Sequence, residues 1–286
     1  MNNTMNTVNQ TFNWSRFTAA LRKEVVENKR MLLFTVICIY GLLTMIMIIG
    51  NVVAGMSADA IADVYTDKVP QMFVGSIMTF VVCVSASMAF KNLTTKPGRA
   101  AYFTSPSSTL EKFLLNILIY IVGTIVVYFV CAQLADLTRI AALWFFRSDN
   151  IIVPGPINFL TSLTDVASTV EHPEIGMQGL GWTVILGLIA NAGLYLLGSV
   201  IWPRLSLLKT FAAIYAIEIA LFILVAPFFA VFGDMQSFSQ WFYDFIMGGK
   251  FSLTLIIILC VQIVLYFGLA WYLFKRKDVI SLKWWK

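Results

Sequence analysis

The chain has 286 residues, of which 59% are hydrophobic and 12% are charged, and its mean hydropathy is +0.82. Soluble globular domains carry about 25% charged residues, so this composition excludes an ordinary soluble fold and indicates an integral membrane protein. The formal net charge of +5 is then expected to reflect contact with anionic membrane lipid, and it gives no reason to predict nucleic-acid binding.

The first 30 residues are predicted to form a cytoplasmic tail that contains an amphipathic helix. Apolar residues recur at Trp14, Phe17, Leu21 and Val25, at spacings of three or four, while basic residues occupy another face. Such a helix is suited to lie at the cytoplasmic membrane surface. Two interpretations stay open: a juxtamembrane anchor that orients the first span, or a part of a partner interface.

Six apolar runs follow, each long enough to cross the hydrocarbon layer as a helix of about 20 residues. We therefore predict an all-α integral membrane protein with six transmembrane helices in a domain over residues 31–274. The predicted spans are 31–53, 72–90, 113–135, 179–202, 210–232 and 251–274.

Lysine and arginine are unequally distributed between the two sides of these spans. Sixteen lie in the N-terminal tail, the 91–112 loop, the 203–209 turn and the 275–286 tail, and four lie in the opposite segments. Because positive side chains collect on the cytoplasmic side, both termini are predicted to be cytoplasmic, with 275–286 as a basic tail. The segment 136–178 is predicted to be external.

The 91–112 loop has its own local signals. The run Lys96-Pro97-Gly98-Arg99 is predicted to end a helix, and Ser108-Thr109-Leu110-Glu111 matches a capping box at the start of the third span. The loop is thus expected to be a positioned element. From this pattern alone, a docking element and a well-capped turn are equally open.

The loop also carries a longer pattern, which consists of Lys96, Gly98-Arg99, Tyr102, Ser105-Pro106, Ser108 and Leu110-Glu111-Lys112-Phe113. This pattern resembles the segment between the second and third spans of ABC-2 type permeases, the membrane subunits of bacterial ABC exporters. The helix before the first span, the six spans and the basic tail are similar too. The best-known members place their largest external segment before the sixth span, whereas this chain places it after the third.

The resemblance implies a multi-pass subunit of the inner (cytoplasmic) membrane that forms a substrate pathway with a second permease subunit, as a homodimer or heterodimer. A separate ABC ATPase would drive transport through the 91–112 loop. The chain contains no G-x-x-x-x-G-K-S/T phosphate loop, so ATP hydrolysis is expected in the partner, which would bind ATP and Mg. We expect no enzyme activity, no catalytic residue, no metal and no cofactor in this chain. The expected ATPase-coupling residues are Lys96, Arg99, Tyr102, Phe103, Glu111 and Lys112.

Three polar residues fall within predicted spans: Glu218, Asn191 and Gln262. Because an intramembrane carboxylate is costly, Glu218 is expected to face the bundle interior and find a partner there, or to be protonated. A polar pathway and a packing role both remain open. There are two alternatives to an ABC-2 permease. One is an ion-coupled secondary transporter that uses Glu218, for which paired half-repeats are expected in the sequence. The other is a non-transporting membrane scaffold or accessory subunit.

Overall fold

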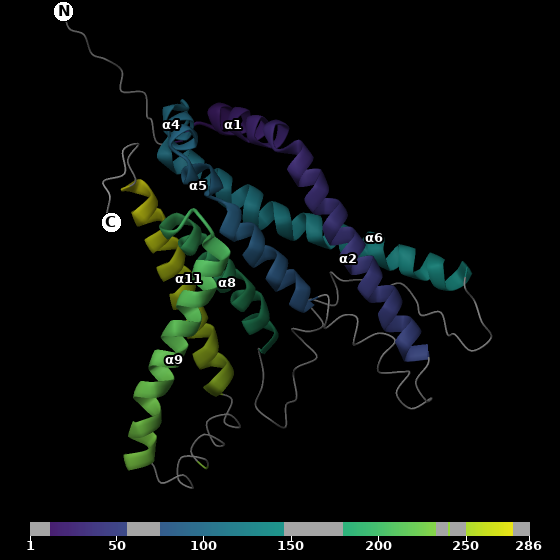
Figure 1. Ribbon diagram of the computed structural model, residues 1–286, viewed down its shortest axis with the longest axis vertical. Coiled ribbons are helices and arrows are strands. Elements are labelled where there is room, and N and C mark those ends of the chain that lie inside the picture. The colour runs from purple at the N-terminus through teal and green to yellow at the C-terminus, as the bar shows by residue number, and fades with distance from the viewer. Residues whose placement is uncertain (1–11, 56–74, 146–179, 233–239, 241–249, 277–286) are drawn as a thin grey trace, which may run out of the picture.

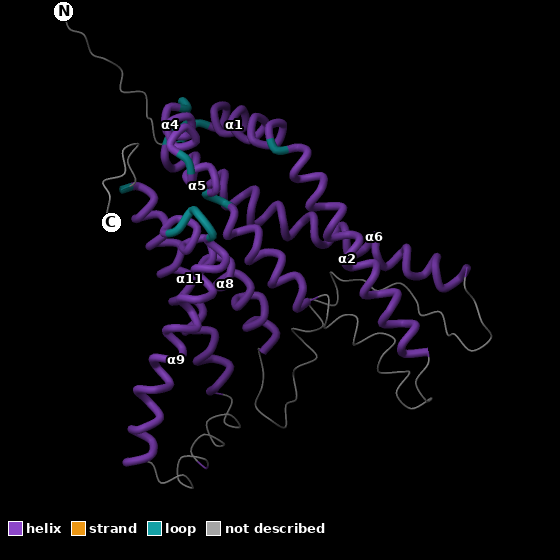
Figure 2. Tube along the Cα trace, viewed as in Figure 1, coloured by secondary structure: helices purple, strands orange, loops and turns teal. Residues whose placement is uncertain are grey.

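The structure is a computed structural model that describes residues 12–55, 75–145, 180–232, 240 and 250–276 (Figure 1). All regular secondary structure within these ranges is helical (Figure 2). The elements are α1 (Trp14–Glu27), α2 (Lys29–Gly55), a helix over Gly75–Met88, η1 (Lys91–Thr94), α4 (Lys96–Thr104), α5 (Thr109–Ile117), η2 (Leu118–Gly123), α6 (Thr124–Phe145), α8 (Leu180–Ile201), α9 (Ser206–Phe232) and α11 (Lys250–Lys275).

Five helical stretches in the described ranges are long and apolar enough to cross a membrane. They are Lys29–Gly50, Thr109–Ala142, Trp182–Ile201, Ser206–Leu224 and Leu253–Lys275. Each overlaps a span predicted from hydropathy. The remaining predicted span, 72–90, corresponds to the shorter apolar helix Gly75–Met88, and residues 72–74 lie outside the described part. The described part of the chain is therefore all-helical, and its apolar helices indicate a multi-pass membrane protein.

The helix that contains the third predicted span is longer than the sequence indicated. Helix α5 continues through one π-helical stretch, η2, into α6. The predicted end at residue 135 is corrected, because the helix continues to Phe145; residues 146–178 lie outside the described ranges. Asp136 and Arg139 are both buried and form an ion pair of 2.7 Å one turn apart. This pairing lets the helix carry both charges past the predicted end.

The long helices pack in two sets. Helix α2 packs on α6, while α8 packs on α11 and also meets α9 (Figure 1). Small residues allow the close approaches in the second set. A Cβ atom on Gly193 would lie 2.7 Å from the ring of Phe267 in α11, and one on Gly198 would overlap the side chain of Thr210 in α9. These contacts follow the use of small residues at membrane helix interfaces.

An aromatic cluster joins the end of α11 to the loop between the second and third predicted spans. Phe274 is 1% exposed and its ring centroid lies 5.0 Å from Phe90 and 5.8 Å from Phe113. Tyr102 and Phe103 of α4 contact Phe274 at centroid distances of 6.3 and 6.4 Å. Offset and edge contacts of this kind stabilise beyond simple burial, so the cluster fixes α4 against the end of a long helix.

Candidate functional site

The candidate site is the assembly of α1, α4 and α5, called here the loop assembly. Within this assembly, the expectation that Lys96-Pro97-Gly98-Arg99 ends a helix is wrong, because these residues form the first turn of α4. The helix begins at Lys96 instead, and the Thr95 side chain accepts a hydrogen bond of 3.2 Å from the Gly98 backbone N–H. Proline fits here because the first helical turn needs no intrahelical amide donor.

Gly98 is required by a close backbone approach rather than by its dihedral freedom. A Cβ atom at this position would lie 2.5 Å from the carbonyl oxygen of Asn92 and 2.8 Å from Oγ1 of Thr95. Asn92 belongs to η1, so the missing side chain lets α4 start directly against the preceding turn. The Gly in the Gly98-Arg99 pair therefore sets the position of α4.

The predicted capping box is confirmed and extends into a wider contact. The Ser108 side chain accepts from the Glu111 N–H at 3.2 Å, and Oε2 of Glu111 accepts from the Ser108 N–H at 2.8 Å. The other carboxylate oxygen, Oε1, accepts from the Asn13 N–H at 2.7 Å and from the Arg16 guanidinium at 3.0 Å. A single buried carboxylate thus caps α5 and holds the beginning of α1 against it.

Lys112 is 6% exposed and holds the end of α4. Its ammonium group donates to the carbonyl oxygens of Phe103 at 3.3 Å and Ser105 at 3.2 Å. It also lies 5.6 Å from the ring centroid of Tyr102 and 5.9 Å from that of Phe103. A cation at a helix C-terminus satisfies carbonyl groups that lack intrahelical partners.

Tyr102 links α4 to α5 through its side chain. The Asn116 amide donates a hydrogen bond of 2.8 Å to the Tyr102 hydroxyl. Burial raises the pKa of Tyr102 above its ordinary value, and the bond from Asn116 acts in the other direction. The hydroxyl therefore stays neutral at physiological pH and serves as a hydrogen-bonding group.

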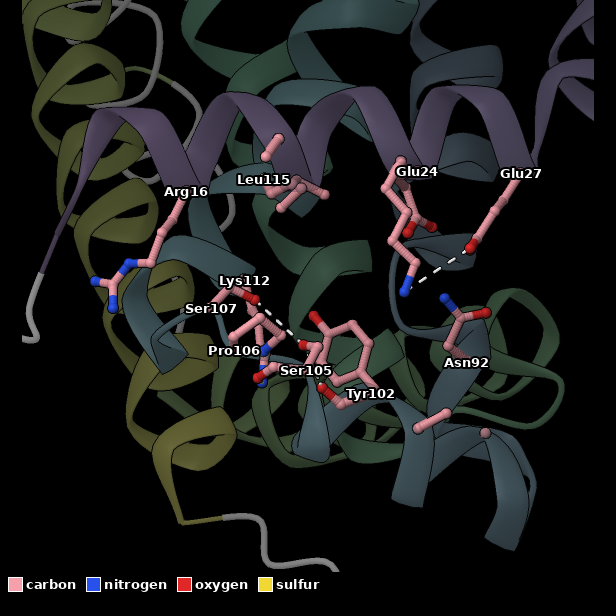
Figure 3. Close-up of a pocket in the computed structure, with 15 residues that line it drawn as sticks. Arg16, Glu24, Glu27, Asn92, Tyr102, Ser105, Pro106, Ser107, Lys112 and Leu115 are labelled. Atoms are coloured by element: carbon pink, nitrogen blue, oxygen red, sulfur yellow. Dashed lines mark hydrogen bonds and ion pairs between the residues drawn. The ribbon is translucent and has the colours of Figure 1, made fainter.

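A cleft of about 460 Å³ lies between α1 on one side and α4 and α5 on the other (Figure 3). Glu24 and Glu27 reach from α1 toward Asn92, while Tyr102 and Lys112 lie on the opposite wall (Figure 3). Small side chains leave the space open. The lining residues that share this property are Ala19, Ala20, Gly98 and Ala101.

Glu24 is a half-buried carboxyl in the lining of the cleft. Burial raises the pKa of this carboxyl, and the nearby charge of Glu27 acts in the same direction. The Asn28 amide donates to the Glu24 carboxylate at 2.9 Å and lowers the pKa in part. Lys23 lies 3.8 Å from Glu27 and both side chains are exposed, so that pair contributes little.

The six predicted coupling residues divide into two groups. Lys96 is exposed and Arg99, Tyr102 and Phe103 are partly exposed, so they can contribute to an outer surface. Glu111 and Lys112 are buried, at 0% and 6% exposure, which corrects the expectation that they belong to the partner-facing surface. Their charges are used within the chain, where they position α1, α4 and α5.

The structure does not bring the three polar residues of the predicted spans, Asn191, Gln262 and Glu218, together in one site. Asn191 is exposed and donates a hydrogen bond of 2.8 Å to the Gly187 carbonyl in its own helix. Gln262 is partly buried in α11, and Glu218 is exposed on α9. In the described part of the chain, Glu218 does not face the interior as expected, because its side chain is exposed on α9. Lipid exposure of a carboxylate costs about 2.5 to 3.5 kcal/mol.

Sequence reasoning missed the residues that bind Glu111 from a distance. Asn13 and Arg16 precede it by 98 and 95 positions, and no local pattern connects such positions. The Asp136–Arg139 pair was also missed, although its i,i+3 spacing was a usable signal for a continuing helix.

In the part of the chain that the structure describes, no group of three or more His, Cys, Asp or Glu side chains is placed so that it could bind a metal ion. The loop assembly is built from hydrogen bonds, ion pairs and aromatic contacts, which suit binding and positioning. In comparisons with known proteins, no family model, no curated protein and no solved structure matches the chain.

Proposed function

We propose that the chain is the membrane-spanning permease subunit of an ATP-driven transporter of the ABC-2 type. It would form the substrate pathway as a dimer, and a separate ATPase, which binds ATP and Mg, would act on the 91–112 loop. The observation that carries this proposal is the construction of the loop assembly. A buried carboxylate, a buried ammonium group and an aromatic cluster all fix its position.

A fixed loop can transmit force, whereas a slack linker cannot. Glu111 holds α1 to α5, Lys112 holds the end of α4, and Phe274 connects α4 to α11. A displacement of α4 would therefore be transmitted to both α1 and α11, because the loop between them is held in place. This is the mechanical property that coupling to a separate ATPase requires.

The membrane arrangement that goes with this function has six spans and cytoplasmic termini. Its second span would be the helix Gly75–Met88 with the residues before it. Helix α1 would lie at the cytoplasmic membrane surface, where its exposed Trp14, Val25 and Val26 would meet lipid and its basic residues would meet headgroups. Sixteen of the 20 Lys and Arg residues would then be cytoplasmic, in the inner membrane of a bacterial cell.

The accessible residues of α4 supply the surface that an ATPase would contact. Lys96 is exposed in the first turn of this helix, and Arg99 follows one turn later. The cleft beside them has an open wall of small side chains. A partner helix or loop with acidic and apolar groups would complement this combination.

The test is purification of the tagged chain from its native membrane in mild detergent, followed by mass spectrometry and an ATPase assay. We expect a nucleotide-binding subunit to accompany the wild-type chain. Lys96→Glu should abolish this association without unfolding α4, because an acidic residue is favourable in the first turn of a helix. Lys209→Glu is the matched control, since Lys209 is an exposed lysine in the first turn of α9.

Recovery of the wild-type chain with no ATPase would contradict the proposed function. Equal loss of the ATPase in both variants would also contradict a specific role for α4. Retention by Lys209→Glu with loss by Lys96→Glu supports it.

A further inference from the structure

The cleft between α1 and the pair α4 and α5 contains a carboxylate that the chain does not neutralise. Glu24 is half-buried, and its side chain points from α1 into the cleft (Figure 3). It accepts a hydrogen bond of 2.9 Å from the Asn28 amide, and it forms no ion pair with any residue in the described ranges. A partly desolvated carboxylate without a cation is a favourable place for a positively charged group from outside the chain.

The basic side chains that line the same cleft have other partners. Arg16 binds Glu111 at 3.0 Å, and the ammonium group of Lys112 donates to two backbone carbonyls at the end of α4. Lys23 lies 3.8 Å from the exposed carboxylate of Glu27. Burial and then the charge of Glu27 raise the pKa of the half-buried carboxylate, and Lys23 opposes them least of the groups that lower it. The potential at this end of the cleft therefore favours a cation.

Neutral hydrogen-bonding groups lie across the cleft from Glu24 (Figure 3). The Tyr102 hydroxyl accepts from the Asn116 amide at 2.8 Å and retains a second lone pair. The Asn92 amide lowers the pKa of Glu24 through its N–H group, and its carbonyl oxygen can accept a further hydrogen bond. A primary ammonium group has three N–H donors, so one carboxylate and two neutral oxygens match it in number.

A metal ion fits this end of the cleft less well than an organic cation. Ca²⁺ takes about six to eight oxygen ligands, and no group of three or more His, Cys, Asp or Glu side chains in the described part of the chain is placed to hold a metal. The cleft volume of about 460 Å³ also leaves room for an organic group around the charge.

Apolar surface lies directly beside the carboxylate. Val25 and Val26 follow Glu24 in α1 and are 43% and 56% exposed, while Ala20 and Leu115 line the cleft. A ligand that carries its ammonium group on an apolar body would contact both kinds of surface. A phospholipid with an ethanolamine headgroup has this chemistry if α1 lies at the membrane surface, and small soluble amines share the ammonium group.

We propose that the Glu24 end of the cleft is a binding site for a primary ammonium group, which is carried by a phosphatidylethanolamine headgroup or by a small soluble amine. Glu24 is its counter-ion, and the oxygens of Asn92 and Tyr102 accept hydrogen bonds from its other N–H groups. A trimethylammonium group has the same charge but no N–H donor, so it does not satisfy these oxygens. The site goes beyond the proposed function, and ligand binding to it can be measured without any ATPase.

Two pairs of probes identify the source of the ammonium group. Isothermal titration calorimetry measures the binding of ethanolamine and of choline to the full chain in phosphatidylcholine nanodiscs. Native mass spectrometry measures the binding of phosphatidylethanolamine and of phosphatidylcholine to the chain in detergent. We expect the primary ammonium to be preferred by at least about tenfold in one pair or both. Preference in the lipid pair alone identifies the headgroup as the ligand, and preference in the ethanolamine pair alone identifies a soluble amine.

Variants assign the binding to Glu24. Glu24→Gln keeps the shape of the side chain and removes its charge, so it should weaken binding of the preferred probe by at least about tenfold. Glu27→Gln should stay within about threefold of wild type, because Glu27 is exposed and pairs with Lys23.

The comparison of probes on the wild-type chain needs no variant, so the test holds even where Glu24→Gln fails to fold. A wild-type chain with no preference for the primary ammonium in either pair would overturn the proposal. Equal affinities of wild type and folded Glu24→Gln for the preferred probe would overturn it as well.

Discussion

The loop assembly and helix α9 differ in whether the chain itself provides hydrogen-bonding partners for their charged side chains. In the loop assembly, Glu111 and Lys112 are buried and both charges are satisfied by the chain itself through hydrogen bonds of 2.7 to 3.3 Å. On α9, Glu218 is exposed with no such bond in the described ranges. The comparison teaches that the buried charges of the loop assembly are satisfied within one chain, whereas the carboxyl of Glu218 is exposed on α9 in the described part of the chain.

The largest effect is expected from breaking the aromatic cluster that anchors the loop assembly. Phe274→Ala removes the ring that contacts Phe90, Tyr102, Phe103 and Phe113, and such a cavity costs about 3 to 5 kcal/mol of unfolding free energy. Thermal or denaturant unfolding of the purified chain in detergent measures this loss. Leu269→Ala is the control, because Leu269 of the same helix is 47% exposed, and an equal loss there would show that the cluster has no special role.

The second effect tests whether Glu111 satisfies this region from inside. Glu111→Ala leaves the Ser108 and Asn13 amides and the Arg16 guanidinium without their acceptor, which should lower the unfolding free energy by about 2 to 3 kcal/mol. Glu27→Ala on α1 should change it by less than about 0.5 kcal/mol, because Glu27 forms an exposed pair. Denaturant unfolding of the two variants measures the difference, and similar losses in both would contradict the central role of Glu111.

A smaller effect is expected where α4 meets the preceding turn. Gly98→Ala places a methyl group 2.5 Å from the Asn92 carbonyl oxygen, so α4 must shift at a cost of about 1 to 2 kcal/mol. Gly41→Ala is the matched control, since a Cβ atom there would meet no neighbouring group within 4 Å and alanine is favoured in a helix interior. Limited proteolysis within the 91–112 loop should increase in the first variant and stay unchanged in the second.

The accuracy of the sequence-based expectations follows the same division between local and distant information. The apolar runs predicted the positions of the long helices, because hydropathy is summed over about 20 neighbouring residues. The Ser108–Glu111 capping box was predicted for the same reason, since both partners lie within four residues. The contacts from Asn13 and Arg16 to Glu111 depend on tertiary packing across almost 100 positions, and no periodic pattern carries that information.

Two other predictions were wrong for a different reason. Each relied on the structure that a residue type usually indicates, and at its position in this chain the residue has a different effect. Pro97 usually indicates a helix end, but in the first turn of α4 it removes no hydrogen bond. Asp136 usually indicates the end of a span, but Arg139 neutralises it on the same helix face. Glu218 differs from both, because hydropathy predicts that an intramembrane carboxylate needs a partner without indicating whether that partner lies in the same chain.

The smallest effect concerns Glu24, a cleft residue whose charge the loop assembly satisfies only in part. Burial and Glu27 raise the pKa of Glu24 above its ordinary value of 4.5, so the folded chain binds this proton more tightly than the unfolded chain. The resulting stabilisation is present below pH 4.5 and is lost as the pH rises from there through the raised pKa. Glu24→Gln should therefore raise stability at pH 7 by no more than about 0.5 kcal/mol and weaken the dependence of the melting temperature on pH above pH 4.5. Arg22→Gln, an exposed change on the same helix, should keep the wild-type slope. A slope that persists in Glu24→Gln would mean that another group titrates in this window, and the cleft would then be as fully satisfied within one chain as the capping box beside it.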